Sequence, residues 1–429
     1  MLNPTQLMSP ATPLRSSYRW TVLALLLVVY ALNFVDRQII GILAIPIKRE
    51  LALTDTQLGA LGGVAFALFY AALGIPVAWL ADRKSRSWIV TISLTLWSLF
   101  TALCGTATGF WQLFLYRMGV GVGEAGGVAP SFALITDYFP KHQRARAFAV
   151  YSFGIPIGSA TGILLGGWIA NAVDWRTAFV VVGLAGVLFA PIFRMAVREP
   201  ARGGQDEHTP APQAGTSFGQ IVRLLAGKRS FWLIAFASSF ASMVNYGLLF
   251  WLPAFFGRSF GLDLVQISMF YGSLVLVGGL IGIWCGGWLG DRFGASNPAA
   301  YVLLPACAFV LVVPLYAIGL LSQSLLVAFI LLLPPSALAY LWIGPVITSI
   351  QHLVPPEMRA TASACFLFIN NLIGIGFGSL LFGYLADVLG AQFGSQSLKY
   401  SILFGLSIYV LSAALFALAS RHIRRDSHC

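Results

Sequence analysis

Two acidic side chains stand inside long apolar stretches of the sequence, where an ionised group is costly. They are Asp36 and Glu124, and each has an arginine on the same stretch, Arg37 for the first and Arg117 for the second. An ionised side chain at the centre of a membrane helix costs about 3 kcal/mol on insertion scales. Residues this costly are kept for function more often than for packing, so these four form the candidate centre.

Helical spacing predicts that the four charges converge. In a helix, Asn33, Asp36 and Arg37 fall at positions i, i+3 and i+4, which share one face. Arg117 and Glu124 also share a face, about 10 Å apart along the axis at 1.5 Å per residue. Asp36 and Glu124 lie at similar depths in their stretches. We therefore expect one buried cluster.

A buried carboxyl beside an arginine can exchange a proton when its surroundings change. Desolvation and a nearby cation act on its proton affinity in opposite directions, so a conformational change can load or release the proton. We expect Asp36 to be the main protonation site and Glu124 the second. Arg37 would be a counter-ion that switches partner or meets an anionic ligand group. Permanent Asp36–Arg37 or Arg117–Glu124 pairs that only support the fold are the alternative.

The composition indicates a membrane protein. Of 429 residues, 58% are hydrophobic and 10% are charged, whereas soluble domains carry about 25% charged residues. Twelve stretches reach the roughly 20 apolar residues that a span needs. We predict an all-α integral membrane fold of twelve helices in two six-helix halves. The expected division is a tail at 1–18, bundles at 19–197 and 230–420, a polar linker at 198–229 and a second tail at 421–429.

The positive charges predict the orientation. Most of the 26 Lys and Arg residues fall in loops on one side of the membrane. This asymmetry predicts that the protein lies in the cell membrane with both termini on the cytoplasmic side. This distribution accounts for the net charge of +11 without a nucleic-acid partner. The five cysteines are scattered, and no metal-binding or nucleophile–base pattern is present. We therefore expect neither an enzyme nor a cofactor.

The two halves of the sequence repeat. AWLADR at Ala78–Arg83 recurs as GWLGDR at Gly287–Arg292, and the glycines of one span recur in the second half. Such repeats predict two parallel bundles around a central cavity. The sequence separation between the two loop motifs also relates Asp36 and Arg37 to Asn245 and Tyr246 in the second half. Because Asn245 and Tyr246 are uncharged, the two halves are not equivalent.

The repeated loops resemble the loop signature of the major facilitator superfamily. That resemblance implies transport by alternating access, with loop residues that latch a cytoplasmic gate: Asp82, Arg83, Arg86, Asp291 and Arg292. A simple positively charged loop that stops membrane insertion is the alternative. The central cavity is expected to be lined by Asn33, Tyr70, Asn245, Tyr246, Trp251 and Asn370.

Five segments resemble the spinster-like branch of that superfamily, in its bacterial form. They are Tyr30–Arg37 (YALNFVDR), Gly119–Pro130 (GVGVGEAGGVAP), Asp174–Arg176 (DWR), Asn245–Pro253 (NYGLLFWLP) and Pro355–Ala364 (PPEMRATASA). The resemblance implies a monomeric, proton-coupled transporter of a small molecule, lysolipid or sphingoid-like, among membrane lipids. It assigns the coupling to Asp36, Arg37 and Glu124.

A symporter of organic anions such as sugar acids is the alternative family, because it places a similar Asn-x-x-Asp-Arg pattern in its first span. The residues do not distinguish a proton from a sodium ion as the coupling ion.

The fifth apolar stretch carries a run of small residues with one proline. Gly154, Pro156, Gly158 and Gly162 predict a kink and a close approach to a neighbouring helix. Tight packing is the simpler interpretation, and a hinge is the alternative.

Overall fold

The chain folds entirely into helices over the part that the computed structural model describes, which is residues 16–81, 83–201, 218–294, 297–355 and 358–426. The N-terminal half contains ten helical segments: α1 (Ser16–Ile42), α2 (Ala44–Glu50), α3 (Asp55–Gly62), α4 (Val64–Ala81), α5 (Arg86–Cys104), α6 (Phe110–Glu124), α7 (Val128–Tyr138), α8 (Lys141–Ser152), α9 (Gly154–Ala172) and α10 (Trp175–Ala196).

The C-terminal half follows a short connecting helix, α11 (Phe218–Ala226). It contains α12 (Arg229–Phe260), α13 (Leu264–Gly294), α14 (Ala300–Leu321), α15 (Leu325–Leu338), α16 (Ile343–His352), α17 (Arg359–Phe393), the 3₁₀ turn η2 (Gly394–Gln396), α18 (Ser397–Gly405) and α19 (Ser407–Asp426).

Twelve passes cross the length of the molecule, as the apolar stretches predict. Eleven helical stretches are long and apolar enough to span a membrane, and the last of these, Thr361–Ile423, has 63 residues. It comprises two passes, because α17 ends at Phe393 and the following Gly394, with a φ of +52°, lets the chain turn back into α18 and α19. The predicted all-α fold of two six-helix halves is therefore confirmed.

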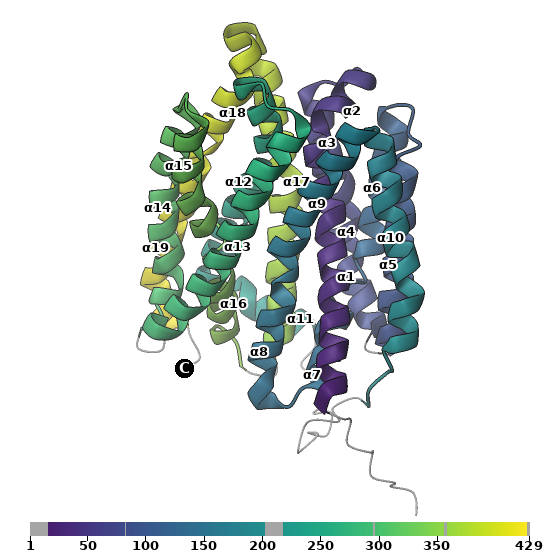
Figure 1. The fold of residues 1–429 in the computed structure, drawn as a ribbon. Helices are drawn as coiled ribbons and strands as arrows, with labels where there is room; N and C mark the ends of the chain where they lie inside the picture. Colours follow the sequence, from purple (N-terminus) through teal and green to yellow (C-terminus); the bar gives the residue numbers. More distant parts are fainter. Residues whose placement is uncertain (1–15, 82, 202–217, 295–296, 356–357, 427–429) are drawn as a thin grey trace, which may run out of the picture.

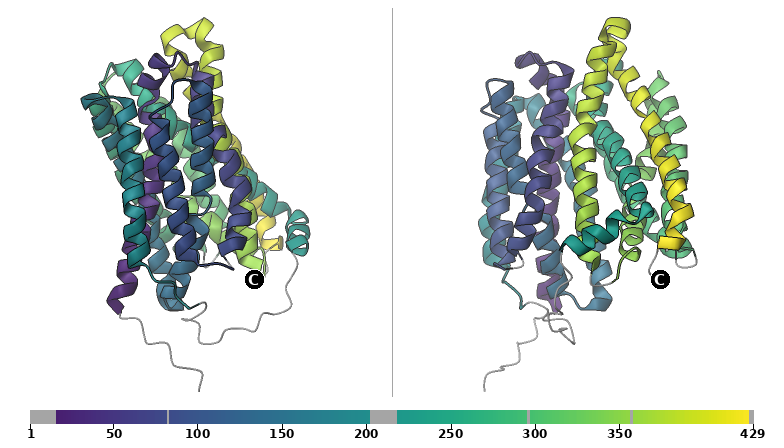
Figure 2. Two further views of the ribbon diagram at one scale, coloured as in Figure 1. Left: turned by 90° about the vertical axis from the view of Figure 1, so that its right-hand side faces the viewer. Right: turned by 180° about the vertical axis from the view of Figure 1, so that it is seen from behind.

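The two halves stand side by side with their helices roughly parallel (Figures 1 and 2). Helix α1 begins and α19 ends at the same end of the bundle, here called the terminal end, which is at the bottom of Figure 1. The opposite end, where α2, α3 and α18 lie, is called the far end.

Several passes of the N-terminal half are interrupted along their length. The first and second passes break at Leu43 and Gly63, and the fourth breaks directly after Glu124. The fifth breaks at Phe153, one turn before Pro156, because a proline has no N–H to bond the carbonyl four residues earlier. These breaks lie close to the charged residues that the sequence singled out.

Small residues bring equivalent helices together in both halves. A Cβ on Gly158 of α9 would lie 2.2 Å from the Ala31 carbonyl oxygen of α1, and one on Gly162 would lie 2.7 Å from that of Val35. In the second half, a Cβ on Gly378 of α17 would lie 2.5 Å from the Met243 oxygen of α12. The same contact therefore recurs in both halves, and the glycines hold α1 in place.

The linker is more ordered than its polar sequence suggests. Residues 218–226 form α11, whose Ile221 and Leu225 are buried in the main apolar core. The two side chains are four residues apart and so occupy one helix face. The more polar part of the linker, 202–217, lies outside the described residues.

Candidate functional site

The centre of the N-terminal half contains a buried ion pair between its first and fourth passes. Arg37 Nε lies 2.7 Å from Glu124 Oε2, and the Glu124 side chain is completely buried. Among the described residues, neither Glu124 Oε1 nor Arg37 Nη2 has a hydrogen-bond partner. The ion pair therefore leaves part of the hydrogen-bonding capacity of both side chains unused, and each side chain retains an atom that can bond another group.

Aromatic rings surround the Arg37 guanidinium. Its Cζ lies 5.1 Å from the ring centre of Phe34, 4.8 Å from that of Phe66 and 4.7 Å from that of Tyr70. Such contacts stabilise a cation where water is excluded. These three rings, called the aromatic cage, hold the charge of Arg37 in place while leaving its outer nitrogen available.

Asp36 and Arg37 contact different neighbours, which corrects the expectation that they share one face, and the alternative of a permanent Asp36–Arg37 pair is not observed. Successive residues of a helix are about 100° apart, so Arg37 reaches Glu124 of α6 while Asp36 turns toward α5. Trp97 and Thr101 of α5 are within hydrogen-bonding reach of its carboxyl. Asp36 is 2% exposed and lies in electrostatic range of Glu124 and Arg117.

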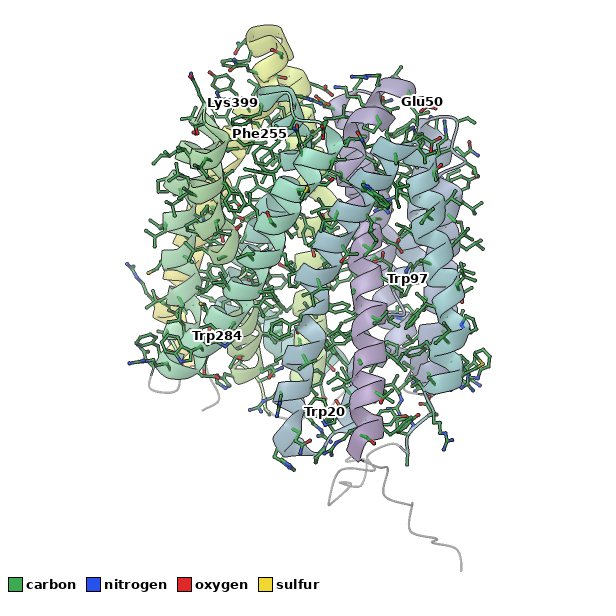
Figure 3. The ribbon with its side chains drawn as sticks, in the orientation of Figure 1. Trp20, Glu50, Trp97, Phe255, Trp284 and Lys399 are labelled. Atoms are coloured by element: carbon green, nitrogen blue, oxygen red, sulfur yellow. The ribbon has the colours of Figure 1, made fainter. Side chains whose placement is uncertain are left out.

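The surroundings of Asp36 are polar but incompletely bonded. Asp36 Oδ1, Trp97 Nε1 and Thr101 Oγ1 are all buried, and none forms a hydrogen bond of normal geometry within the described chain. Trp97 lies at mid-height of the N-terminal bundle (Figure 3). The sequence analysis missed both α5 residues, although their four-residue spacing places them on one face.

Arg117 is bound by backbone oxygens and forms no ion pair with Glu124, so the alternative Arg117–Glu124 pair is not observed. Its Nε and Nη1 atoms lie 3.4 Å from the carbonyl oxygens of Leu61 and Asp36. The residue is 1% exposed. It therefore connects α6 to α3 and α1 and places a positive charge near Asp36.

A pocket adjoins the ion pair at the interface of the two halves. Arg37, Gln38, Phe66 and Arg117 line it from the N-terminal half, and Tyr246 and Ile375 line it from the C-terminal half. Tyr246 thus occupies the position expected of a cavity residue. Asn33 is buried in the same bundle and adjoins Glu124. Gln38 is a lining residue that the sequence analysis did not identify.

Two of the expected cavity residues pack between helices instead. Trp251 is completely buried, and its Nε1 donates to the Ser379 carbonyl oxygen at 2.7 Å. Asn370 is 4% exposed and accepts a 2.9 Å hydrogen bond from Ser242 Oγ. Both contacts join α12 to α17, so these residues support the cavity wall and do not line either pocket. Asn245 lines a second pocket, described below.

The loop after the second pass is tied to its own half. Arg86 contacts Asp137 at the end of α7 and places its Nε 2.9 Å from Glu199, just after α10. Arg83 is exposed and covers the Trp79 ring. Asp82, a predicted gating residue, lies outside the described residues.

In the second half, the matching loop is open to solvent. Asp291 and Arg292 are exposed, and Arg292 lies over the ring of Trp288. Among the predicted gating residues within the described part of the chain, Arg86 is the one that forms ion pairs, with Asp137 and Glu199.

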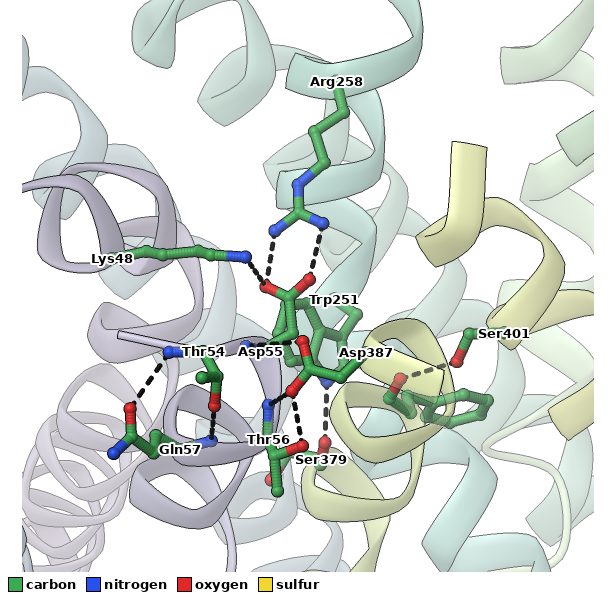
Figure 4. Close-up of polar contacts among 11 residues, drawn as sticks. Lys48, Thr54, Asp55, Thr56, Gln57, Trp251, Arg258, Ser379, Asp387 and Ser401 are labelled. Atoms are coloured by element: carbon green, nitrogen blue, oxygen red, sulfur yellow. Dashed lines mark hydrogen bonds and ion pairs between the residues drawn. The ribbon is translucent and has the colours of Figure 1, made fainter. Parts of the chain in front are cut away.

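A second carboxylate centre joins the halves at the far end. The buried Asp55 of α3 accepts bonds from both terminal nitrogens of Arg258 of α12, at 2.9 and 2.7 Å, and from Lys48 at 2.6 Å (Figure 4). Asp387 of α17 accepts from the backbone amide of Thr56 at 2.7 Å. These contacts, called the far-end latch, close that end of the interface.

The chain matches the model of the Major Facilitator Superfamily over residues 26–379. It belongs to the major facilitator superfamily. An MFS-type efflux pump of Mycolicibacterium smegmatis is 34% identical over 95% of this chain and 94% of its own length. Human protein spinster homolog 1 is 27% identical over 94% of this chain and 81% of its own.

Solved structures place the chain in the spinster-like branch. A bacterial homolog of the human lysosomal transporter Spinster, in an inward-facing and unoccupied conformation, is 30% identical with a TM-score of 0.88, covering 96% of this chain and 99% of the homolog. Its inward-facing and occupied form gives a TM-score of 0.83. This protein is therefore a multi-pass membrane transporter and not an enzyme.

Proposed function

We propose that this spinster-like protein is a proton-coupled transporter of an amphipathic or organic anionic small molecule. The observation that carries the proposal is the buried Arg37–Glu124 pair, in which each partner retains one unbonded atom and Arg37 lines the pocket. A guanidinium with a free nitrogen in an aromatic cage suits the carboxylate or phosphate of a solute. The protein would lie in the cell membrane with both termini in the cytoplasm.

Proton binding and solute binding are coupled because Glu124 and the anionic group of the solute compete for Arg37. When Glu124 is ionised, it occupies the guanidinium, and a solute anion must displace it. Protonation of Glu124 removes that competitor, so proton and anion favour each other's binding by the same factor. This order reverses the expectation from the sequence, in which Asp36 is the main protonation site and Glu124 the second. We assign Asp36 to the second proton site because it is buried and incompletely bonded behind the Arg37–Glu124 pair.

The organic anion symporter is the second candidate. The free Arg37 nitrogen favours it, since a single guanidinium can hold a small sugar acid as readily as a lipid headgroup. The likeness to human protein spinster homolog 1 and to the bacterial Spinster homolog favours the spinster-like interpretation.

Proteoliposomes containing the purified protein and an internal pH dye test the proposal. We expect an added anion, either lysophosphatidylglycerol or gluconate, to drive proton movement that protein-free liposomes lack. Gluconate alone would indicate the symporter, and the lysolipid alone would indicate the lipid-like solute. Solute flux that requires sodium and moves no protons would contradict proton coupling.

A further inference from the structure

The C-terminal half contains a neutral polar pocket that the coupling site does not use. It lies between α12, α13, α14 and the segment after α15. Its lining includes Asn245, Leu249, Tyr271, Tyr316, Ser336 and Tyr340. Its lining contains hydroxyl and amide groups but no acidic or basic side chain. This pocket is called the tyrosine pocket.

One hydroxyl in the tyrosine pocket forms no hydrogen bond of normal geometry to the described residues. Tyr340 is 6% exposed, and its hydroxyl makes no hydrogen bond to the described residues. By contrast, Ser336 Oγ bonds the Leu333 oxygen at 2.7 Å, and the Tyr271 hydroxyl reaches the Leu248 oxygen at 3.4 Å. Asn245 is within hydrogen-bonding reach of the Tyr340 hydroxyl, but the two form no hydrogen bond of normal geometry, so both groups can bond a solute.

The chemistry of the lining selects the kind of group that fits. A buried polar group without a partner costs free energy, and an alkyl chain packed against it leaves that cost in place. A charged group would lose its hydration without a counter-ion. An uncharged hydroxyl or amide group can form a hydrogen bond with the Tyr340 hydroxyl. It therefore avoids both the cost of an unpaired buried polar group and the cost of a dehydrated charge.

The tyrosine pocket neighbours the pocket at Arg37. Leu249 lines both, and the sequence neighbours Asn245 and Tyr246 line one each. Because Leu249 is the shared wall, a solute that displaces its side chain would extend from the guanidinium toward Tyr340.

We infer that the tyrosine pocket is a subsite for an uncharged hydroxyl or amide group of the transported solute, whose anionic group binds Arg37. The inference rests on the proposed function and narrows it. The substrate class becomes organic anions that carry a neutral hydrogen-bonding group, and simple alkyl anions bind less well.

A matched pair of acids tests this subsite in the purified protein. The probes are 3-(4-hydroxyphenyl)propanoate and 3-phenylpropanoate, which differ by one hydroxyl, and binding is measured by thermal-shift titration. We expect the hydroxylated acid to bind about tenfold more tightly, the effect of about one net hydrogen bond. Tyr340→Phe should bring the ratio close to one.

Tyr409→Phe is the matched control. Tyr409 is also fully buried with an unbonded hydroxyl in the described chain, but it stacks on Phe309 and does not line the tyrosine pocket. Equal binding of the two acids to the wild type overturns the subsite, as does a ratio that survives Tyr340→Phe or falls equally in Tyr409→Phe. Binding of neither acid at any pH contradicts the anionic substrate, and so the proposed function itself.

Discussion

At the scale of single residues, the site divides its charges between two environments. Arg37 and Glu124 face the interface of the two halves, where the aromatic cage and Tyr246 adjoin them. Asp36 lies behind them, beside two donors of α5. The adjacent residues Asp36 and Arg37 thus contact different neighbours. Arg37 and Glu124 can form a pair that responds to the solute, while Asp36 remains a separate buried carboxyl.

Thr101 is expected to position Asp36 and to tune the proton dependence of transport. Thr101→Val keeps the shape of the side chain but removes the hydroxyl, so the ionised carboxyl loses one donor. We expect the pH profile of transport to move toward higher pH, because the protonated form of Asp36 becomes relatively more favourable. The profile is measured in proteoliposomes from pH 5 to 9.

Thr101→Ser restores the hydroxyl and should restore the profile. A Val variant with a lower rate but an unchanged profile would mean that Thr101 only supports packing.

At the scale of helices, close contacts fix the position of the site. Gly158 and Gly162 place α9 against the backbone of α1 just before Asp36. The Arg86 cluster similarly joins the start of α5 to the ends of α7 and α10. The glycine contacts and the Arg86 cluster both lie within the N-terminal half, so they can hold that half as one rigid unit.

Gly158→Ala should destabilise the protein. The added methyl would lie 2.2 Å from the Ala31 carbonyl oxygen, and that backbone must shift. Overpacking of this kind costs about 1–3 kcal/mol, which appears as a lower thermal unfolding temperature. Gly74→Ala is the control, because no atom lies within 4 Å of its added Cβ. Equal effects of the two variants would argue against the close contact.

The Arg86 cluster should weaken in acid. Burial alone would raise the pKa of Glu199, but hydrogen bonds from the Ser87 amide, the Ser85 hydroxyl and Arg86 outweigh it and lower the pKa to about 2. A depressed pKa stabilises the fold above the ordinary value of 4.5, and this contribution is lost as pH falls toward about 2.

Thermal unfolding measured at pH 7 and at pH 3 tests this contribution. Glu199→Gln should reduce the loss of stability between the two pH values. An identical loss in the wild type and the variant would exclude Glu199 as a contributor.

Most of the element pattern follows from the sequence, because long apolar runs and repeated loops carry strong signals. The cluster of Asp36, Arg37, Arg117 and Glu124 also follows, since each charge is costly in its span. Their pairing does not follow, because it depends on how α1 is rotated against α5 and α6. For the same reason Trp251, whose aromatic ring suggests a cavity wall, instead packs between α12 and α17.

At the scale of the whole molecule, the far-end latch holds the two halves together at one end. Asp55 lies in the N-terminal half and Arg258 in the C-terminal half, while Asp387 bonds the first residues of α3 from the other side. Opening that end requires these bonds to break. The closed far end agrees with the likeness to inward-facing structures.

Arg258→Gln should open the far end more often. Removal of one partner leaves the buried Asp55 with less compensation, which favours separation of the halves. Opening is measured with Gln38→Cys in a protein whose natural cysteines have been removed. A membrane-impermeant maleimide is added from the far side, and the rate at which it labels this cysteine reports the opening of the far end. We expect faster labelling in Arg258→Gln.

Arg176→Gln is the control, because Arg176 pairs with Glu50 at 2.8 Å within the N-terminal half. Labelling that is equally fast in both variants would mean that the far-end latch does not control opening.

The central claim is that protons and a solute anion are coupled through the Arg37–Glu124 pair, with Asp36 as the second proton site. The most direct measurement is anion-driven proton movement in proteoliposomes of the wild type, Asp36→Asn and Glu124→Gln, with anion binding measured on the same preparations. We predict that both variants bind the anion but move few or no protons, and that Glu124→Gln binds it with little dependence on pH. Full proton movement in both variants would contradict the claim.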